Sequence, residues 1–115
     1  MQRNRDVQIA RHIIGYCHEV EEALLRFGKD KETFLQDAVF RNACAMPLMQ
    51  IGELAKKFSD AFIAEHDAIP WKAVKGMRTI FAHDYQSMDR SMIWDTAVYD
   101  TPAVKQVLEE FLRQR

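Results

Sequence analysis

Apolar residues recur three and four positions apart along the first quarter of the chain. They are Ala10, Ile13, Cys17, Val20, Leu24 and Phe27. This spacing places all of them on one face of a helix, while most charged residues fall on the other faces. Gly28 follows the last of them, and glycine is frequent at helix ends. The pattern therefore predicts a long amphipathic helix that ends near Gly28 and packs in a helical bundle.

A second helical pattern runs from about residue 30 to about residue 58, with Asp30 placed to cap its start. Its apolar residues cover more than one face, which predicts burial against both its own bundle and a second subunit. Pro47 lies inside the pattern, so we expect a kink there. Polar residues also interrupt the apolar sequence, namely Arg41, Asn42, Gln50 and Glu53. They are either exposed or paired with one another, or they lie near a functional site.

Three shorter helices follow in the pattern. Pro70 suits the first position of a third helix, because that position needs no backbone donor. Asp89 is placed to cap a fourth helix, and Thr101 with Pro102 predicts its end and the start of the last one. The chain is thus predicted to be an all-α, up-and-down bundle of four to five helices. The first two are expected to be long and antiparallel.

Composition agrees with this fold and limits the function. The chain has 115 residues, 48% hydrophobic, with only 4 Gly and 3 Pro. This length suits one domain with one core, which we take to span residues 1–115. Sixteen basic residues against 17 acidic ones give a net charge of −1, which excludes a surface that is basic throughout. Any site for a polyanion must therefore be local.

Three features bear on the compartment. Cys17 and Cys44 lie in apolar helical patterns without the spacing of a metal site, as expected for buried thiols in a reducing compartment. The N-terminus is charged where a signal peptide needs an apolar segment. No apolar run approaches the roughly 18 residues that span a bilayer. We therefore expect a cytoplasmic protein that does not engage a membrane.

The candidate chemistry is concentrated in residues 76–85, GMRTIFAHDY. The guanidinium of Arg78 can bind phosphate oxygens through a fixed fork of donors, and the imidazole of His83 can transfer a proton near neutral pH. Five residues on an ideal helix turn about 140° beyond a full circle, so these side chains would not converge from an unbroken helix. Either the helix loosens before His83, or a second chain completes the site.

The segment 78–85, RTIFAHDY, resembles the R-x4-H-x-Y motif of the HepT-like ribonuclease toxins, a branch of the HEPN superfamily. The similarity extends to IGELAK at 51–56, IPW at 69–71 and IW at 93–94, so it covers most of the chain in the right order. The sequence departs from the family pattern at Pro47, and at 79–81, where an asparagine often follows the arginine.

This resemblance implies a homodimeric, metal-independent endoribonuclease without a cofactor. Arg78 and His83 would be the catalytic residues, facing a cleft shared by two subunits. The resemblance also implies a toxin–antitoxin pair, in which a minimal nucleotidyltransferase antitoxin attaches AMP to Tyr85. Lys72 and Lys75, which precede Arg78 at three-residue intervals, would contact the RNA.

Two alternatives to these assignments stay open. Lys72 and Lys75 by themselves also fit an ordinary solvated face. The whole chain could be a non-catalytic helical module that binds nucleotides or only a nucleotidyltransferase partner. The near-neutral charge favours this second function, whereas the intact set of Arg78, His83 and Tyr85 favours the ribonuclease.

Overall fold

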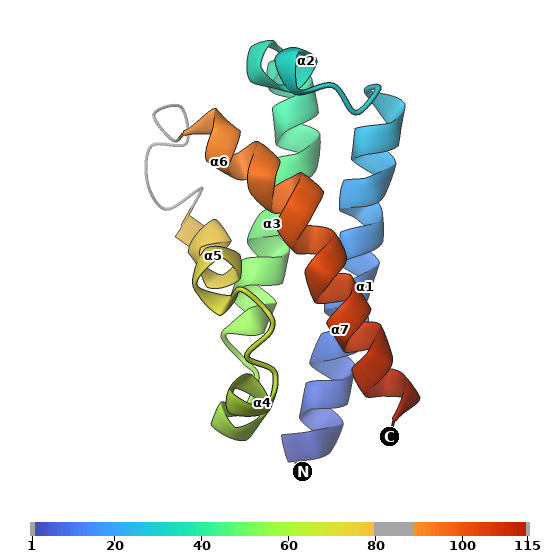
Figure 1. Ribbon diagram of the computed structural model, residues 1–115, viewed down its shortest axis with the longest axis vertical. Coiled ribbons are helices and arrows are strands. Elements are labelled where there is room, and N and C mark those ends of the chain that lie inside the picture. The colour runs from blue at the N-terminus through green and yellow to red at the C-terminus, as the bar shows by residue number, and fades with distance from the viewer. Residues whose placement is uncertain (1, 80–88, 115) are drawn as a thin grey trace.

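A computed structural model describes residues 2–79 and 89–114, and every regular element in these ranges is helical (Figure 1). The elements are α1 (Gln2–Arg26), α2 (Lys31–Gln36), α3 (Ala38–Ala55), α4 (Asp60–Glu65), α5 (Trp71–Gly76), a 3-10 turn η1 (Met77–Thr79), α6 (Arg90–Asp95), a π-helical turn η3 (Thr96–Asp100) and α7 (Thr101–Arg113). The predicted all-α bundle is confirmed. His83 and Tyr85 lie outside the described residues.

The two long helices α1 and α3 form the centre of the bundle and run antiparallel, with α7 packed across α1 (Figure 1). The predicted apolar seam of α1 is confirmed: its residues are buried from Ala10 to Leu24, and Phe27 is half-buried. Gly28 has a φ of +88°, a conformation that favours glycine, and the adjacent Lys29 N–H bonds back to the Leu24 carbonyl. The glycine therefore ends α1 as predicted.

The second predicted helix is broken near its start, so the prediction of one helix over residues 30–58 is wrong. Asp30 does cap a helix, but that helix is α2, which has six residues. Asp37 is extended, and its carboxylate accepts the N–H groups of Val39 and Phe40 as the cap of α3. An aspartate can either cap a helix in this way or lie inside one. The pattern of apolar residues does not show which of the two occurs. The second long helix is thus α3, and it continues through Pro47.

The C-terminal helices are joined, which contradicts the predicted break at Thr101. The chain is helical from Arg90 to Arg113, with a wider π-helical turn at η3. Both the N–H and the Oγ1 of the buried Thr101 donate to the carbonyl of Thr96. Pro102 has no N–H to donate, and an extra residue in the preceding turn gives its ring room. Thr101 is therefore an internal helix residue and not a cap.

Aromatic side chains fill the two ends of the bundle. One cluster joins Phe27, Phe34 and Phe40 to Trp94 of α6. The other joins Phe58 and Phe62 to His66, Trp71 and Phe111. In this second cluster, Trp71 also donates its indole N–H to the His66 carbonyl at 2.9 Å. The start of α5 is therefore fixed to the turn after α4.

Both cysteines are buried and free, as predicted. Burial raises the pKa of Cys17 to about 12, and burial likewise raises the pKa of Cys44 to about 12. Both thiols thus stay protonated at neutral pH and serve as core residues. Among the helices described, none combines the length and apolar character needed to cross a bilayer.

Candidate active site

Arg78 lies where the α-helical geometry of α5 ends. Helix α5 stops at Gly76, and Met77–Thr79 form the tighter turn η1. Val74 and Met77 are 3% exposed and anchor this segment in the core, whereas Arg78 is exposed. The hydroxyl of Thr79 donates to the Gly76 carbonyl at 2.7 Å and closes the turn. The α-helical geometry therefore ends before Arg78, and the 140° question stays a prediction because His83 lies outside the described residues.

Gly52 sets the position of this turn. A Cβ placed on Gly52 would lie 2.7 Å from the backbone nitrogen of Arg78 and 2.9 Å from the carbonyl oxygen of Val74. Both distances are shorter than side-chain contacts allow, so α3 and the α5–η1 segment meet backbone to backbone. Only glycine fits here without a shift of one element. The sequence analysis contained this residue only as part of the IGELAK segment at 51–56; a glycine inside an apolar helical pattern is a signal that could have marked a packing role.

Glu53, the next residue on α3, contacts the Arg78 side chain. The Nε of Arg78 donates to Oε1 of Glu53 at 3.4 Å, and the two side chains are 41% and 44% exposed. A pair this exposed contributes only about 0–1 kcal/mol to stability. The carboxylate therefore orients the guanidinium without burying it. Of the polar residues left open by the sequence, Glu53 is the one found next to Arg78.

The terminal nitrogens of Arg78 make no hydrogen bond to residues 2–79 or 89–114. They are the forked donors that would bind two oxygens of one phosphate. Lys72 is exposed and Lys75 is half-buried on α5. Because the two lysines are three residues apart, they share one side of that helix. A local cluster of positive charge thus leads along α5 to Arg78, in a chain with a net charge of −1.

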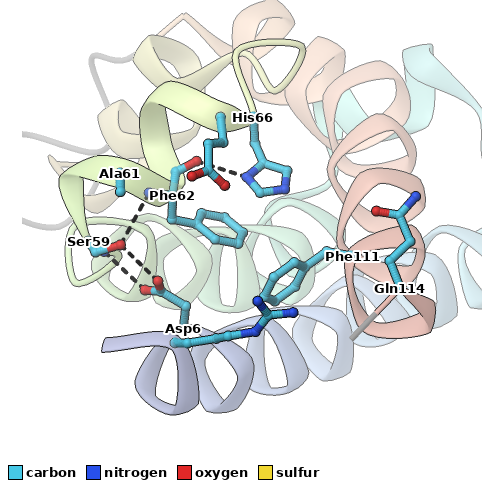
Figure 2. A pocket seen from close by; sticks show the side chains of 9 residues that line it. Asp6, Ser59, Ala61, Phe62, His66, Phe111 and Gln114 are labelled. Atoms are coloured by element: carbon cyan, nitrogen blue, oxygen red, sulfur yellow. Dashed lines mark hydrogen bonds between the residues drawn. The ribbon is translucent and has the colours of Figure 1, made fainter. Parts of the chain in front are cut away.

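One pocket of the described chain lies elsewhere and contains none of the predicted site residues. It has a volume of about 370 Å³ and opens between α1, α4 and α7 (Figure 2). Its most buried polar group, Asp6, is 6% exposed and accepts both the N–H and the hydroxyl of Ser59. This carboxylate is satisfied within the fold, where it ties α1 to the start of α4. This pocket therefore does not mark the candidate site.

Comparison with known proteins agrees with the motif. Residues 13–111 match the sequence profile of the family described as Ribonuclease HepT-like. The chain is 30% identical over 103 residues to "Putative RNase TTE0752" of Caldanaerobacter subterraneus subsp. tengcongensis, covering 90% of each chain. It is also 30% identical over 103 residues to "Putative RNase MJ0125" of Methanocaldococcus jannaschii, covering 88% of this chain and 85% of the relative. No solved structure matches the chain.

Proposed function

This chain belongs to the HepT-like ribonuclease family, and we propose that it is the toxin of a toxin–antitoxin pair, an endoribonuclease that cleaves RNA without a metal ion. The observation that carries the proposal is the setting of Arg78. Its backbone packs closely against Gly52, its Nε donates to Glu53, and its side chain is 41% exposed. Such a group suits binding of a phosphate more than support of the fold.

In the proposed reaction, the 2′-hydroxyl of the RNA attacks the adjacent phosphorus. The bond from phosphorus to the 5′-oxygen breaks, which leaves a 2′,3′-cyclic phosphate and a free 5′-hydroxyl. His83 accepts the proton of the attacking hydroxyl or protonates the leaving oxygen, a role worth about 10²- to 10⁴-fold in rate. Arg78 stabilises the negative charge that grows on the phosphorane oxygens.

Homodimerisation is part of the proposal, and an exposed stripe of α3 supports it. Val39 and Met46 are 65% and 52% exposed, and Glu53 is the next residue at the same seven-residue interval. Seven residues return a helix to within about 20° of the same face. The apolar stripe of Val39 and Met46 therefore runs along α3 to Glu53, which contacts Arg78. A second copy placed across it by a twofold axis would bring two Arg78 side chains toward one cleft.

Charged substitutions in the stripe test the dimer. Val39→Glu or Met46→Glu should convert the dimer to a folded monomer in light scattering, because each buries a carboxylate in an apolar contact. Leu25→Glu is the matched control, since Leu25 is 72% exposed but lies on α1. A parent protein that is monomeric at micromolar concentration would refute this part of the proposal.

The proposed antitoxin is a minimal nucleotidyltransferase that modifies Tyr85. The phenol oxygen attacks the α-phosphorus of ATP, AMP is transferred and pyrophosphate leaves. The added negative charge would compete with RNA for the Arg78 guanidinium, so cleavage should fall. Peptide mass spectrometry after incubation with the cognate enzyme and ATP tests this. Modification that spares Tyr85, or that leaves RNA cleavage unchanged, would contradict it.

The central test is cleavage by the purified protein. The parent should arrest growth and leave 2′,3′-cyclic phosphate ends on RNA, and His83→Ala should abolish both while remaining folded by circular dichroism. Arg26→Ala is the control, because Arg26 is an exposed arginine at the far end of α1. A parent that cleaves no RNA but binds the nucleotidyltransferase would instead establish the non-catalytic module, which the near-neutral charge favours.

A further inference from the structure

Lys56 ends the IGELAK segment at residues 51–56, which also contains Gly52 and Glu53. It directly follows the last residue of α3 and keeps right-handed helical backbone angles, with φ −60° and ψ −24°. Its side chain is exposed, and none of the ion pairs among residues 2–79 and 89–114 includes it. Lys56 thus carries a positive charge that these parts of the fold do not neutralise.

Lys56 lies on the side of α3 that contacts Arg78. Helix α5 runs beside the C-terminal half of α3 (Figure 1). Four residues turn a helix by about 400°, so Lys56 stands about 40° around the axis from Gly52 and about 5.4 Å further along it. The Arg78 backbone packs against Gly52, with its nitrogen 2.7 Å from the place of a Cβ there. Glu53, which accepts from Arg78 Nε, lies about 60° from Lys56 in the other direction.

The Lys56 side chain is directed toward this contact. In an α-helix the Cα–Cβ bonds tilt toward the N-terminus, so that a residue covers the turn that precedes it. For Lys56 the preceding turn contains Gly52 and Glu53, the two residues that touch Arg78. The exposed apolar stripe of α3 lies within about 40° of Glu53 on the side away from Lys56. A second subunit on that stripe would therefore not cover the sector between Lys56 and Arg78.

The neighbouring Lys57 differs because it faces α1 and the start of α4. It lines a hollow of about 250 Å³ together with Arg5, Asp6, Phe58, Ser59 and Asp60. This hollow contains two carboxylates and no residue of α5. Both lysines are exposed at the C-terminal end of α3, where positive charges stabilise the helix dipole. The dipole would give both lysines the same role, whereas only Lys56 lies on the side of Arg78.

We propose that Lys56 binds the RNA phosphate next to the one bound by Arg78, so that two successive phosphates of the strand are held. The inference rests on the proposed function, since it assumes that Arg78 binds a phosphate of RNA. A lysine ammonium is a point charge on a flexible stem, so it can bind a phosphate without selecting a base. Lys56 is therefore a substrate-binding residue that helps to align the strand at Arg78.

The salt dependence of RNA binding tests this contact. Each phosphate contact to a single strand contributes about 0.7 to the slope of log affinity against log salt concentration. Lys56→Gln should therefore reduce this slope by about 0.7 and weaken binding about fivefold at low salt, equally for RNAs of different sequence. Anisotropy of a labelled 2′-O-methyl RNA measures both quantities, because that strand lacks the attacking hydroxyl and stays intact. Lys57→Gln is the matched control, with the same charge change at the adjacent residue.

Cleavage kinetics provide a second readout. Lys56 would bind the strand equally in the ground state and the transition state, so Lys56→Gln should raise KM about fivefold and change kcat less than twofold. Lys56→Arg keeps the positive charge and should keep the slope. Combined with Arg78→Ala, Lys56→Gln should reduce the slope by about 1.4, because two phosphate contacts are then lost.

The outcomes separate this inference from the proposed function. If the parent binds and cleaves RNA but Lys56→Gln keeps the slope and keeps its affinity within twofold, the contact is wrong and the ribonuclease stands. An equal loss in Lys57→Gln would also overturn the contact, because the effect would then be one of general surface charge. A parent that neither binds nor cleaves RNA defeats both proposals. Should Lys56→Gln fail to fold by circular dichroism, Lys56→Ala makes the same charge change with a better helix former.

Discussion

Two arginines of this chain, Arg41 and Arg78, are held in opposite ways. Arg41 is 7% exposed, and its Nη1 donates to the carbonyls of Phe34 and Leu35 at 3.0 and 2.9 Å. Arg90 donates to the same Leu35 carbonyl at 2.9 Å. These bonds satisfy the last carbonyls of α2, which have no partner within that helix. The Arg78 side chain is 41% exposed, and its one hydrogen bond to residues 2–79 and 89–114 runs to the exposed Glu53 carboxylate at 3.4 Å.

This difference indicates that Arg41 supports the fold, whereas Arg78 is accessible to a ligand. The Arg41 guanidinium is buried against backbone carbonyls, so binding a ligand would break the junction of α2 and α3. Within the part of the chain that the structure describes, the Arg78 guanidinium bonds through Nε alone, so its terminal nitrogens suit the proposed binding of phosphate oxygens. The sequence motif predicted that Arg78 binds a ligand. Burial and hydrogen-bond partners distinguish Arg78 physically from Arg41, which supports the fold.

The largest effect should come from Arg78→Ala. If Arg78 stabilises the charged transition state, its loss should slow RNA cleavage about 10²- to 10³-fold. The free energy of unfolding should change by no more than about 1 kcal/mol, because the Glu53 pair is exposed. Cleavage rates and urea denaturation measure the two quantities. Arg78→Lys keeps the charge but lacks the planar fork, so it should recover only part of the activity.

Arg41→Met should give the reverse result. The loss of a buried guanidinium that bonds two carbonyls should destabilise the protein by about 2–4 kcal/mol in urea denaturation. The fraction that remains folded should cleave RNA at the parent rate. Arg90→Met is the matched control, because Arg90 is exposed and Arg41 still serves the Leu35 carbonyl. An Arg41 variant as stable as the parent would show that the buried bonds do not support the fold.

Spacing and caps predicted much of this fold because both are local properties. The seam of α1, its end at Gly28 and the caps at Asp30 and Asp89 follow from a few neighbouring residues. Asp37 was missed because the apolar pattern is continuous across it, and only the backbone angles decide whether an aspartate lies inside a helix or caps one. Thr101 followed the usual cap rule, but a π-helical turn accommodated Pro102 without a break.

The candidate site was predictable only in part. Arg78 came from the motif, and the structure adds that its α-helix ends before it. Neither the contact of Gly52 with the Arg78 backbone nor the Glu53 pair could be derived from spacing, because α3 and α5 are distant in sequence and their crossing brings these residues together. Sequence periodicity gives the face of a helix, and the packing of two helices decides which faces meet.

Gly52→Ala should have a smaller effect, and it should lower both stability and RNA cleavage. The new methyl would overlap the Arg78 nitrogen at 2.7 Å and the Val74 carbonyl at 2.9 Å, so α5 must move. Overpacking of this kind costs about 1–3 kcal/mol. Because the displaced segment carries Arg78, cleavage by the folded protein should fall as well. Gly76→Ala is the control, since outside its chain neighbours and its own helix backbone its Cβ would meet no described atom within 4 Å. Equal cleavage by the two variants would contradict the positioning role of Gly52.

The smallest effect is expected from Glu53→Gln, which tests the role of the Glu53 carboxylate most directly. The amide oxygen can still accept from Arg78 Nε, so orientation is largely kept, but the negative charge that competes with a phosphate is removed. A surface pair worth about 0.2–1 kcal/mol corresponds to an affinity change of roughly 1.5- to 5-fold, so the variant should bind RNA more tightly by that factor. Glu53→Ala removes the orienting oxygen as well and should cleave more slowly than Glu53→Gln at saturating RNA. Binding by anisotropy and single-turnover cleavage separate the two effects. If Glu53→Gln weakened RNA binding instead, the carboxylate would be a contact for the RNA, and its hydrogen bond to Arg78 would not be its main role.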